Sequence, residues 1–402
     1  MKEFFKVVNY QQARMYIKDY IPPARQEVVP LALAYDRTLA SEIASPEPLP
    51  AFSRSTVDGY AINARESFGC SESLPAFFTL AGEVLMGQAA ELAIEPGQCV
   101  WIPTGGMLPR GADAVVMIEY TEKMGEDTVL VYRPVAGWEN VMQVGEDIAV
   151  SQVLYKPGKR LRAQDIGMLA SLGFENVPVH QPYRVGIISS GDEVVPVGQK
   201  PLTGQVRDVN SWCLATAVRQ SGNLPRTYPI VQDDCHKLKM AIEQALSEND
   251  LLIMSGGSSV GVKDVTIDVL LASPEARLLF HGIAVKPGKP SLGVALGEQL
   301  VVGLPGHPVS ALMVFHVLLM PLLAQKEFNF VTALCSENIA SQPGRDDFVP
   351  VSLKPEGASW MAQPIFGKSG LMSILARADA FIHIPYEQQG IKKGEMVKAN
   401  LF

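Results

Sequence analysis

The feature that most constrains the fold is a regular alternation of apolar runs and helix-like segments between residues 181 and 325. Each apolar run has the length and β-branched content of a buried strand, and a segment with helical periodicity follows it. The predicted strands are residues 183–193, 228–231, 250–257 and 299–306, and the predicted helices are residues 210–222, 236–249, 265–273 and 309–325. The intervening residues 278–297 read as a β excursion or hairpin. This alternation predicts βαβ units and a central, mostly parallel α/β sheet domain.

The rest of the chain has a different pattern and predicts a multidomain α/β plus β protein. Residues 51–147 contain short apolar runs broken by glycine, proline and charge, which predicts an inserted β domain, either a small barrel or a sandwich. Residues 1–50 and 148–180 combine helical and extended segments and are expected to form a linking domain. Short strands return in residues 326–402, where we expect a second small β domain, a C-terminal β-barrel.

Length, charge and apolar content exclude several classes of protein. The chain has 402 residues, 47% of them hydrophobic, which is too long for one ordinary core and inconsistent with disorder. Its net charge is -8 and no block of lysine and arginine stands out, so we expect no nucleic-acid partner. An acidic protein that binds an anion must concentrate cations and backbone N–H groups locally.

The cysteine pattern and the longest apolar run indicate a cytoplasmic protein that does not enter a membrane. The five cysteines form no CxxC pair, so neither a zinc ribbon nor a disulfide framework is expected. Residues 309–324 form the longest apolar run, but they include His316 and Pro321 and fall short of a bilayer span. The N-terminal segment lacks the apolar core of a signal peptide.

Three glycine-rich loops follow predicted strands of the α/β domain, where ligands bind in open α/β sheets. They are residues 190–193 (SGDE), 255–261 (SGGSSVG) and 303–308 (GLPGHP). Glycine allows backbone N–H groups to turn toward an anion, and a following helix N-terminus adds a favourable partial charge. The alternative is that these loops are tight turns that need glycine only for their geometry. No Walker A motif and no GxGxxG fingerprint is present.

Acidic side chains gather beside the same loops. They are Asp192, Glu193, Asp208, Asp233, Asp234 and Asp264. Carboxylates next to phosphate-binding loops commonly hold Mg²⁺, which bridges phosphate oxygens. Helix capping is the alternative, above all for Asp208 and Asp264, which stand just before predicted helices.

Two further segments have the composition of binding loops. Lys286 and Lys289 lie in the sequence KPGKP, whose prolines would hold two ammonium groups in a nearly fixed relation, as an oxyanion site requires. Residues 53–61 place hydroxyl groups, Asp58 and a glycine at a predicted domain junction, a common location for a site. Asp58 and Thr104 would otherwise be ordinary turn residues.

Together these segments resemble the molybdopterin molybdenumtransferase family, the MoeA type that also forms the E domain of gephyrin. The matching stretches run in order along most of the chain: PAFSRSTVDGYAI (50–62), IPTGGMLPRGADAVVMIE (102–119), GEDI (145–148), SSGDEVV (189–195), the Asp208–Asn210 step, DD (233–234), SGGSSVGVKD (255–264), KPGKP (286–290), GLPGHPVSAL (303–312), GRDDF (344–348) and SGLMSILARAD (369–379). No single motif decides the resemblance, but the ordered set is specific.

The resemblance implies a four-domain, elongated homodimer, with residues 1–50 and 148–180 serving in dimerisation. It implies an active site between the α/β domain of one subunit and loops of the partner. The implied reaction is Mg²⁺-dependent hydrolysis of adenylylated molybdopterin, with release of AMP and transfer of molybdenum from molybdate to the dithiolene. A molybdopterin adenylyltransferase would act upstream, and molybdoenzyme acceptors would receive the product.

The family's functional positions carry over residue by residue. The implied catalytic residues are Asp58, Thr104, Asp147, Glu193, Asp264, Lys286 and Lys289, and the implied metal ligands are Glu193, Asp233, Asp234 and Asp264. The implied residues that bind the pterin substrate or molybdate are Ser190, Gly191, Asp192, Asp208, Gly256, Gly257, Ser258, Pro305, Gly306, Pro308, Ser310, Arg345 and Ser369.

Three positions depart from the family pattern, and other classes of function remain open. One is the arginine that the family commonly has before GEDI, where this chain has Gln143 and Val144. The family often has Asn where His307 stands and a basic residue where Gly282 stands, which concerns substrate affinity more than reaction class. One alternative is a non-catalytic scaffold that binds molybdopterin. Another is an adenylyl-transferring pterin enzyme, which shares the α/β architecture. A generic nucleotide hydrolase is disfavoured because the Walker signatures are missing.

Overall fold

The computed structural model describes residues 6–256, 265–325, 328–357 and 359–402. The chain divides into two compact units, which we describe separately. One unit comprises residues 28–179. The other combines the residues up to 27 with residues 180–402.

A six-stranded sheet of order β16-β13-β17-β21-β20-β18 forms the centre of the second unit. The first four strands of this order are parallel: β16 (Leu224–Thr227), β13 (Arg184–Ser189), β17 (Leu251–Ser255) and β21 (Gln299–Leu304). The last two, β20 (Leu292–Leu296) and β18 (Ala276–His281), extend it in antiparallel pairings. The mostly parallel sheet is therefore present, and the β excursion predicted at 278–297 contributes two of its strands.

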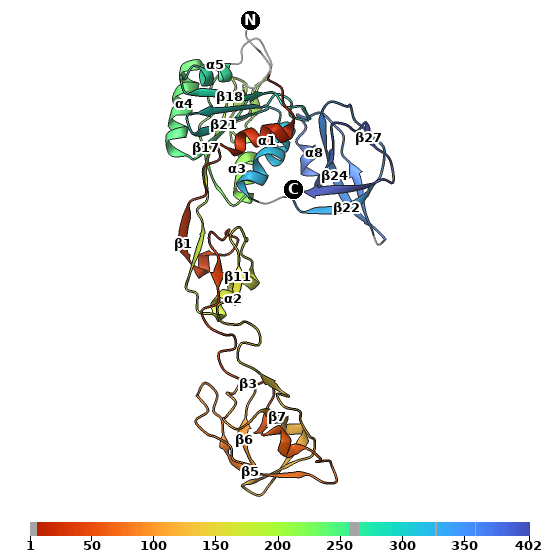
Figure 1. Ribbon diagram of the computed structural model, residues 1–402. Coiled ribbons are helices and arrows are strands. Elements are labelled where there is room, and N and C mark those ends of the chain that lie inside the picture. Colours follow the sequence, from red (N-terminus) through yellow and green to blue (C-terminus); the bar gives the residue numbers. More distant parts are fainter. Residues whose placement is uncertain (1–5, 257–264, 326–327, 358) are drawn as a thin grey trace. The chain divides into compact units, whose positions relative to one another are not determined.

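Helices cover both faces of this sheet because successive strand residues alternate between the faces (Figure 1). They are α1 (Tyr10–Lys18), α3 (Asn210–Gln220) and α6 (Pro308–Val314) on one face, and α4 (Cys235–Glu248) and α5 (Val265–Leu271) on the other. Ile187 and Ile253 point into the first core, whereas Ile188 and Met254 point into the second. Both faces are buried, which explains the continuous apolar runs in the sequence.

Two predicted elements differ in the structure. Residues 228–231 do not form a strand, and the strand at that place is β16, four residues earlier. Pro229 lacks the N–H that a longer ladder with β13 would require. The helix predicted at 309–325 is interrupted, because a π-helical turn over Phe315–Leu319 separates α6 from α7 (Met320–Leu323).

The N-terminal residues pack with the α/β sheet and not with the linking part of the chain. Asn9 and Gln12 form a reciprocal capping box at the start of α1, whose buried face contributes Ala13 and Ile17 to the core. The Tyr183 hydroxyl donates a hydrogen bond to the Pro22 carbonyl at 2.9 Å. The sequence had led us to expect these residues in the linking domain.

The C-terminal residues form a closed barrel. Its strands are β22 (Phe330–Cys335), β24 (Asp346–Glu356), β25 (Ser359–Pro364), β26 (Ala380–Ile384) and β28 (Met396–Leu401). Closure follows because β24 pairs with β25 on one side and with β26 on the other. The short strand β19 (Val285–Lys286) of the α/β region pairs in parallel with the start of β24. This ladder joins the barrel to the α/β sheet within the same unit.

The other unit, residues 28–179, contains a mixed six-stranded sheet of order β7-β4-β6-β5-β9-β8. Its strands are β4 (Gly59–Ile62), β5 (Ala76–Glu83), β6 (Gln98–Ile102), β7 (Ala114–Met117), β8 (Thr121–Met124) and β9 (Thr128–Val131). Two apolar clusters use alternate residues of these strands, such as Ile62 in one and Ala61 in the other. A separate core packs helix α2 (Ala163–Ser171) through Leu169 against Leu39 and Val177.

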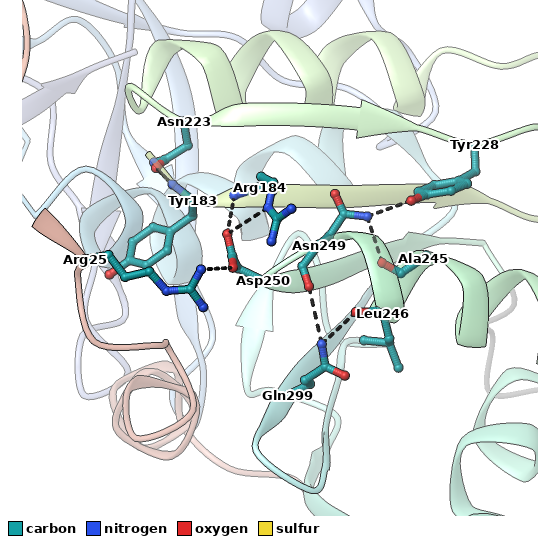
Figure 2. A network of polar contacts seen from close by, with 10 residues as sticks. All are labelled: Arg25, Tyr183, Arg184, Asn223, Tyr228, Ala245, Leu246, Asn249, Asp250 and Gln299. Carbon is teal, nitrogen blue, oxygen red and sulfur yellow. Dashed lines mark hydrogen bonds and ion pairs between the residues drawn. The ribbon is translucent and has the colours of Figure 1, made fainter. Parts of the chain in front are cut away.

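A polar network ties the amino-terminal ends of the parallel strands together (Figure 2). The Asp250 carboxylate accepts a hydrogen bond from the Arg184 backbone N–H at 2.7 Å and lies 3.8 Å from an Arg25 guanidinium nitrogen. The Asn249 amide donates to the Ala245 carbonyl at the end of α4, at 2.7 Å. These side chains stabilise the edge of the sheet opposite to the one where the glycine-rich loops lie.

All five cysteines are free thiols, and burial raises the pKa of Cys99 to about 12, which keeps this thiol protonated and unreactive. Among the described residues, no helix has the length and apolar content needed to cross a membrane.

Candidate functional site

A cavity of about 1520 Å³ lies at the carboxyl ends of β13, β17 and β21, between these strands and the C-terminal barrel. Its lining includes many of the residues singled out from the sequence: Ser190, Glu193, Asp208, Gly256, Lys286, Lys289, Pro305, Gly306, Pro308, Ser310, Arg345 and Ser369. Residues from the α/β sheet and from the barrel thus share one cavity within one compact unit.

The glycine-rich loops meet at the floor of this cavity. The Ser190 N–H donates to the Ser255 carbonyl at 2.9 Å. Gly256 adopts a φ of 97°, and a Cβ at this position would lie 2.1 Å from the Ser190 carbonyl oxygen. A Cβ on Gly306 would lie 3.9 Å from the Gly256 Cα. Gly256 is therefore required by its backbone conformation and by its close approach to the neighbouring loop. Gly257 and Ser258, also expected here, lie outside the described residues.

Asn210, to which the sequence analysis gave no role, connects these loops. Its amide nitrogen donates to the Ser255 Oγ at 2.5 Å and to the Gly306 carbonyl at 2.8 Å. Because the Gly306 carbonyl only accepts, the orientation of the amide is fixed by this network. The Asp208–Asn210 step is one of the stretches that resemble the family, but the sequence alone does not show that Asn210 joins two loops by hydrogen bonds.

Asp208 acts as a helix cap in this structure. Its carboxylate accepts a hydrogen bond from the Ser211 N–H in the first turn of α3 at 3.0 Å and from the Ser189 hydroxyl at 3.1 Å. The residue is buried, at 8% exposed, although it borders the cavity. The sequence left open whether Asp208 binds Mg²⁺ or caps a helix, and the contacts of its carboxylate are those of a helix cap.

Four lysine and arginine side chains line the cavity: one is Arg207, and the other three come from two further segments. Lys286 ends β19 and Lys289 lies in the turn that follows, and both are exposed. Arg345 immediately precedes β24, and the β19–β24 pairing places Asp347 opposite Lys286. The Asp347 carboxylate accepts from the Arg345 Nε at 2.9 Å and lies 4.0 Å from the Lys286 Nζ. The ladder thus brings a predicted arginine of the barrel to the predicted lysine pair.

Hydroxyl groups complete this side of the cavity. The His307 Nδ1 lies 2.9 Å from the Ser369 Oγ, and the Val309 N–H donates to the Ser369 carbonyl at 3.1 Å. His307 also precedes Pro308, the first residue of α6. The imidazole at this departure from the family pattern therefore holds Ser369 in position. Gly282, another departure, bonds through its backbone to Val8 and Ser291.

Carboxylates of two adjacent loops face one another next to the cavity. The Asp233 N–H donates to the Asp192 Oδ1 at 3.2 Å. Burial raises the pKa of Asp233, and the neighbouring charges of Asp192 and Glu193 raise it further. Glu193 lines the cavity, whereas Gly191, Asp192 and Asp233 do not. A divalent cation bound here would relieve the repulsion between these carboxylates.

Asp234 has a different role from its neighbour. Its carboxylate accepts from the Lys237 N–H at 2.9 Å as the N-cap of α4, and this hydrogen bond lowers its pKa. Asp264, another expected ligand, lies outside the described residues. Among the residues that the structure describes, no three His, Cys, Asp or Glu side chains are arranged as a complete metal site.

Asp58, Thr104 and Asp147 belong to the other compact unit, residues 28–179. The Asp58 carboxylate accepts from the Thr104 N–H at 2.6 Å and from its hydroxyl at 2.8 Å, and these two hydrogen bonds lower the pKa of Asp58. Asp147 is exposed in the turn before Ile148. The predicted pair of Asp58 and Thr104 is therefore in direct contact.

Comparisons with known proteins cover almost the whole chain. Residues 8–173 match the family described as MoeA N-terminal region (domain I and II). Residues 186–325 match a family described as a probable molybdopterin binding domain, and residues 332–402 match the MoeA C-terminal region (domain IV).

Named relatives and solved structures agree with these matches. A putative molybdopterin biosynthesis protein of Methanocaldococcus jannaschii is 34% identical, over 93% of this chain and 91% of that protein. A molybdopterin molybdenumtransferase of Haemophilus influenzae is 30% identical, over 98% of this chain and 99% of that protein. The crystal structure of a molybdopterin biosynthesis MoeA protein from Pyrococcus horikoshii superposes with a TM-score of 0.86 at 32% identity, covering 98% of this chain and 99% of that one.

The match extends from the N-terminal region through the central α/β sheet to the barrel, and it includes the strands and loops that form the cavity. The multidomain fold expected from the sequence is the fold of these relatives. The chain belongs to the MoeA family, to which proteins named molybdopterin molybdenumtransferase belong.

Proposed function

We propose that this protein transfers molybdenum from molybdate to adenylylated molybdopterin and releases AMP. The observation that carries the proposal is a single cavity in which Lys286, Lys289 and Arg345 face glycine-rich loops at the carboxyl edge of an α/β sheet. Cations and backbone N–H groups provide what an oxyanion needs in a protein of net charge -8. The relative from Haemophilus influenzae named above, and a further relative from Bacillus subtilis, are named molybdopterin molybdenumtransferase.

Each side of the cavity has a distinct task in this proposal. The lysine pair, Arg345 and the hydroxyls of Ser310 and Ser369 hold the molybdate dianion through charge-assisted hydrogen bonds. The loops at Ser190, Gly256 and Gly306 bind the pterin phosphate and adenylate with backbone donors, and the N-terminus of α6 adds its partial positive charge. Asn210 keeps two of these loops together by its two hydrogen bonds.

Mg²⁺ fits the adjacent carboxylates in donor type and in charge. Asp192, Glu193 and Asp233 would supply hard oxygen ligands, and burial together with the two neighbouring charges raises the pKa of Asp233. We infer that these residues, with Asp264, hold the ion, which would offset charge on the phosphate oxygens. Asp234 is occupied as a helix cap and is not included.

A change of Asp233 tests the metal site through stability. Because the pKa of Asp233 is raised, the folded protein loses stability as the pH rises above about 4, where the carboxyl group ionises in the unfolded chain. We expect Asp233→Asn to raise the Tm of the metal-free protein at neutral pH and to abolish the increase in Tm that Mg²⁺ causes in the original protein.

Asp234→Ala provides the matched control for this experiment. It removes a neighbouring carboxylate that caps α4, so it should lower the Tm and preserve the Mg²⁺-dependent increase. A thermal melt at several pH values, with EDTA or with Mg²⁺, measures both effects. Loss of the Mg²⁺ effect in the Asp234 variant but not in the Asp233 variant would reject this assignment.

We further infer a homodimer of four-domain subunits in which Asp58, Thr104 and Asp147 complete the site of the partner. The contact between Asp58 and Thr104 forms a preorganised polar pair in the unit of residues 28–179, which contributes nothing to the cavity lining. A C₂ dimer would supply two equivalent composite sites.

Mixing two inactive variants tests the composite site. At a molybdate concentration well below that needed by the Lys286→Ala variant, Asp58→Asn and Lys286→Ala should each be nearly inactive alone. Random exchange of equal amounts gives about half heterodimers, each with one intact site, so about one quarter of the original activity should return. A site made by one chain alone would give no recovery, because every chain carries a defect.

The decisive assay incubates the protein with adenylylated molybdopterin, Mg²⁺ and molybdate, and measures AMP and activation of a cofactor-free acceptor enzyme. AMP release that depends on molybdate, together with acceptor activation, supports the proposed reaction. Binding of molybdopterin without AMP release would favour a scaffold, and consumption of ATP would favour an adenylyl-transferring enzyme.

A further inference from the structure

Asp347 is a buried carboxylate in the middle of the cationic side of the cavity. It is 3% exposed, and it contacts two of the cations there, Arg345 and Lys286. We propose that Asp347 is a positioning residue of the oxyanion site, one that orients Arg345 and limits the net positive charge the bound anion meets. This inference rests on the proposed function and deepens it.

The contact with Arg345 determines which donors remain for a ligand. Asp347 Oδ1 accepts from the Arg345 Nε at 2.9 Å, and Nε is the inner nitrogen of the guanidinium group. Among the described residues, neither outer nitrogen of Arg345 has a hydrogen bond within the protein. Four N–H donors in a fixed plane are therefore left for an oxyanion, and a planar fork suits two oxygens of the same anion.

The contact with Lys286 is set by the backbone. Lys286 and Asp347 are register partners in the parallel β19–β24 ladder, and the Asp346 N–H donates to the Ala284 carbonyl at 2.9 Å. Asp347 Oδ2 then lies 4.0 Å from the Lys286 Nζ. The Lys286 side chain remains 59% exposed, so the carboxylate partly neutralises its charge without enclosing it.

The neighbouring Asp346 shows that burial alone does not explain Asp347. Asp346 is also 3% exposed, but its Oδ1 lies 2.7 Å from the His383 Nε2. The His383 ring stacks on Phe348 with 4.8 Å between the ring centroids. Asp346 thus contacts a histidine of the barrel and is not part of the cavity lining, whereas Asp347 is.

A carboxylate among three cations has a functional consequence for a transferred anion. Three unopposed positive charges would hold a dianion tightly in the ground state, and uniform tight binding does not accelerate its transfer. The buried negative charge of Asp347 lowers that affinity, and its hydrogen bond keeps the Arg345 guanidinium group oriented toward the anion. Asp347 therefore favours release of the oxyanion group to the acceptor over its retention.

Asp347→Asn separates charge from shape, because an amide oxygen still accepts from the Arg345 Nε. Isothermal titration of the full-length protein with molybdate, and separately with sulfate, measures the effect. Loss of one negative charge roughly 6 Å from a dianion should tighten binding by about tenfold even at the dielectric constant of water. Turnover in the AMP-release assay should fall. Unchanged or weaker molybdate binding would overturn the inference.

Asp346→Asn is the matched control, since it removes the same charge from an equally buried neighbour. We expect its anion affinity to stay within about twofold of the original. Equal tightening in both variants would mean that any lost negative charge nearby has this effect, and it would overturn the inference. If Asp347→Asn does not fold, Arg345→Lys tests the orientation. It keeps the charge but lacks the planar fork, so molybdate affinity should fall by at least about tenfold. Unchanged affinity would contradict the proposal.

The titrations also distinguish this inference from the proposed function. If the original protein binds neither molybdate nor sulfate, the oxyanion site itself is wrong. If the original protein binds molybdate and Asp347→Asn binds it equally, only the role of Asp347 is wrong.

Discussion

Replacing Lys286 with alanine is expected to weaken molybdate binding by about 10- to 100-fold, since a hydrogen bond to a charged group contributes about 1.5–3 kcal/mol. AMP release should fall with it at low molybdate concentration. The Tm should change little, because the ammonium group is exposed and its 4.0 Å contact with Asp347 is long. Titration calorimetry and a molybdate-dependence curve measure the two effects.

Lys239→Ala is the control for charge. Lys239 is exposed on α4 and lies 3.9 Å from Glu243, outside the cavity lining, so its loss changes the net charge by the same amount. It should leave molybdate affinity within about twofold of the original at physiological salt, where distant charges are screened. Equal losses in the two lysine variants would show that Lys286 acts only through net charge.

Replacing Gly256 with alanine is expected to have the largest combined effect on stability and activity. A Cβ there would lie 2.1 Å from the Ser190 carbonyl oxygen, and a φ of 97° is unfavourable for any L side chain. The two loops must separate, which we expect to cost at least about 2 kcal/mol of unfolding free energy and to reduce activity more than about 100-fold. Chemical denaturation and the AMP-release assay measure these changes.

Gly222→Ala isolates the backbone strain from the collision. Gly222 has a φ of 83° after helix α3, and no heavy atom lies within 4 Å of its added Cβ. This variant should lose about 1 kcal/mol and keep its activity. If Gly256→Ala behaved in the same way, the close packing of the loops at 190 and 256 would have no functional role.

The sequence predicted the α/β sheet well because both of its faces are buried. A doubly covered strand requires a continuous apolar run, and β13, β17 and β21 all have one. β16 is an edge strand with little apolar content, so the sequence favours the more apolar residues 228–231 as a strand. Periodicity also could not reveal that residues 278–297 join the same sheet, because antiparallel hairpins depend on pairings distant in the sequence.

The site was predicted as separate loops, and the structure supplies the contacts between them. Glycine, lysine and carboxylate positions were recognisable from their composition, but the ladder that brings Arg345 to Lys286 depends on a strand pair only two residues long. The roles of Asp347 and Asn210 are not predictable in the same way, because Lys286 is distant from Asp347 in the sequence, and Ser255 and Gly306 are distant from Asn210. The difference between Asp233 and Asp234 likewise depends on which of the two carboxylates caps α4.

The most direct test of the account is to locate molybdate in crystals of the protein by anomalous scattering at the molybdenum edge. The central claim is that the glycine-rich loops and the cationic side chains form one cavity that binds oxyanions in an acidic protein. We therefore expect a molybdenum peak within hydrogen-bonding reach of Lys286, Lys289 and Arg345, and its loss in the Lys286→Ala variant. A peak on another surface, with none in this cavity, would contradict the account.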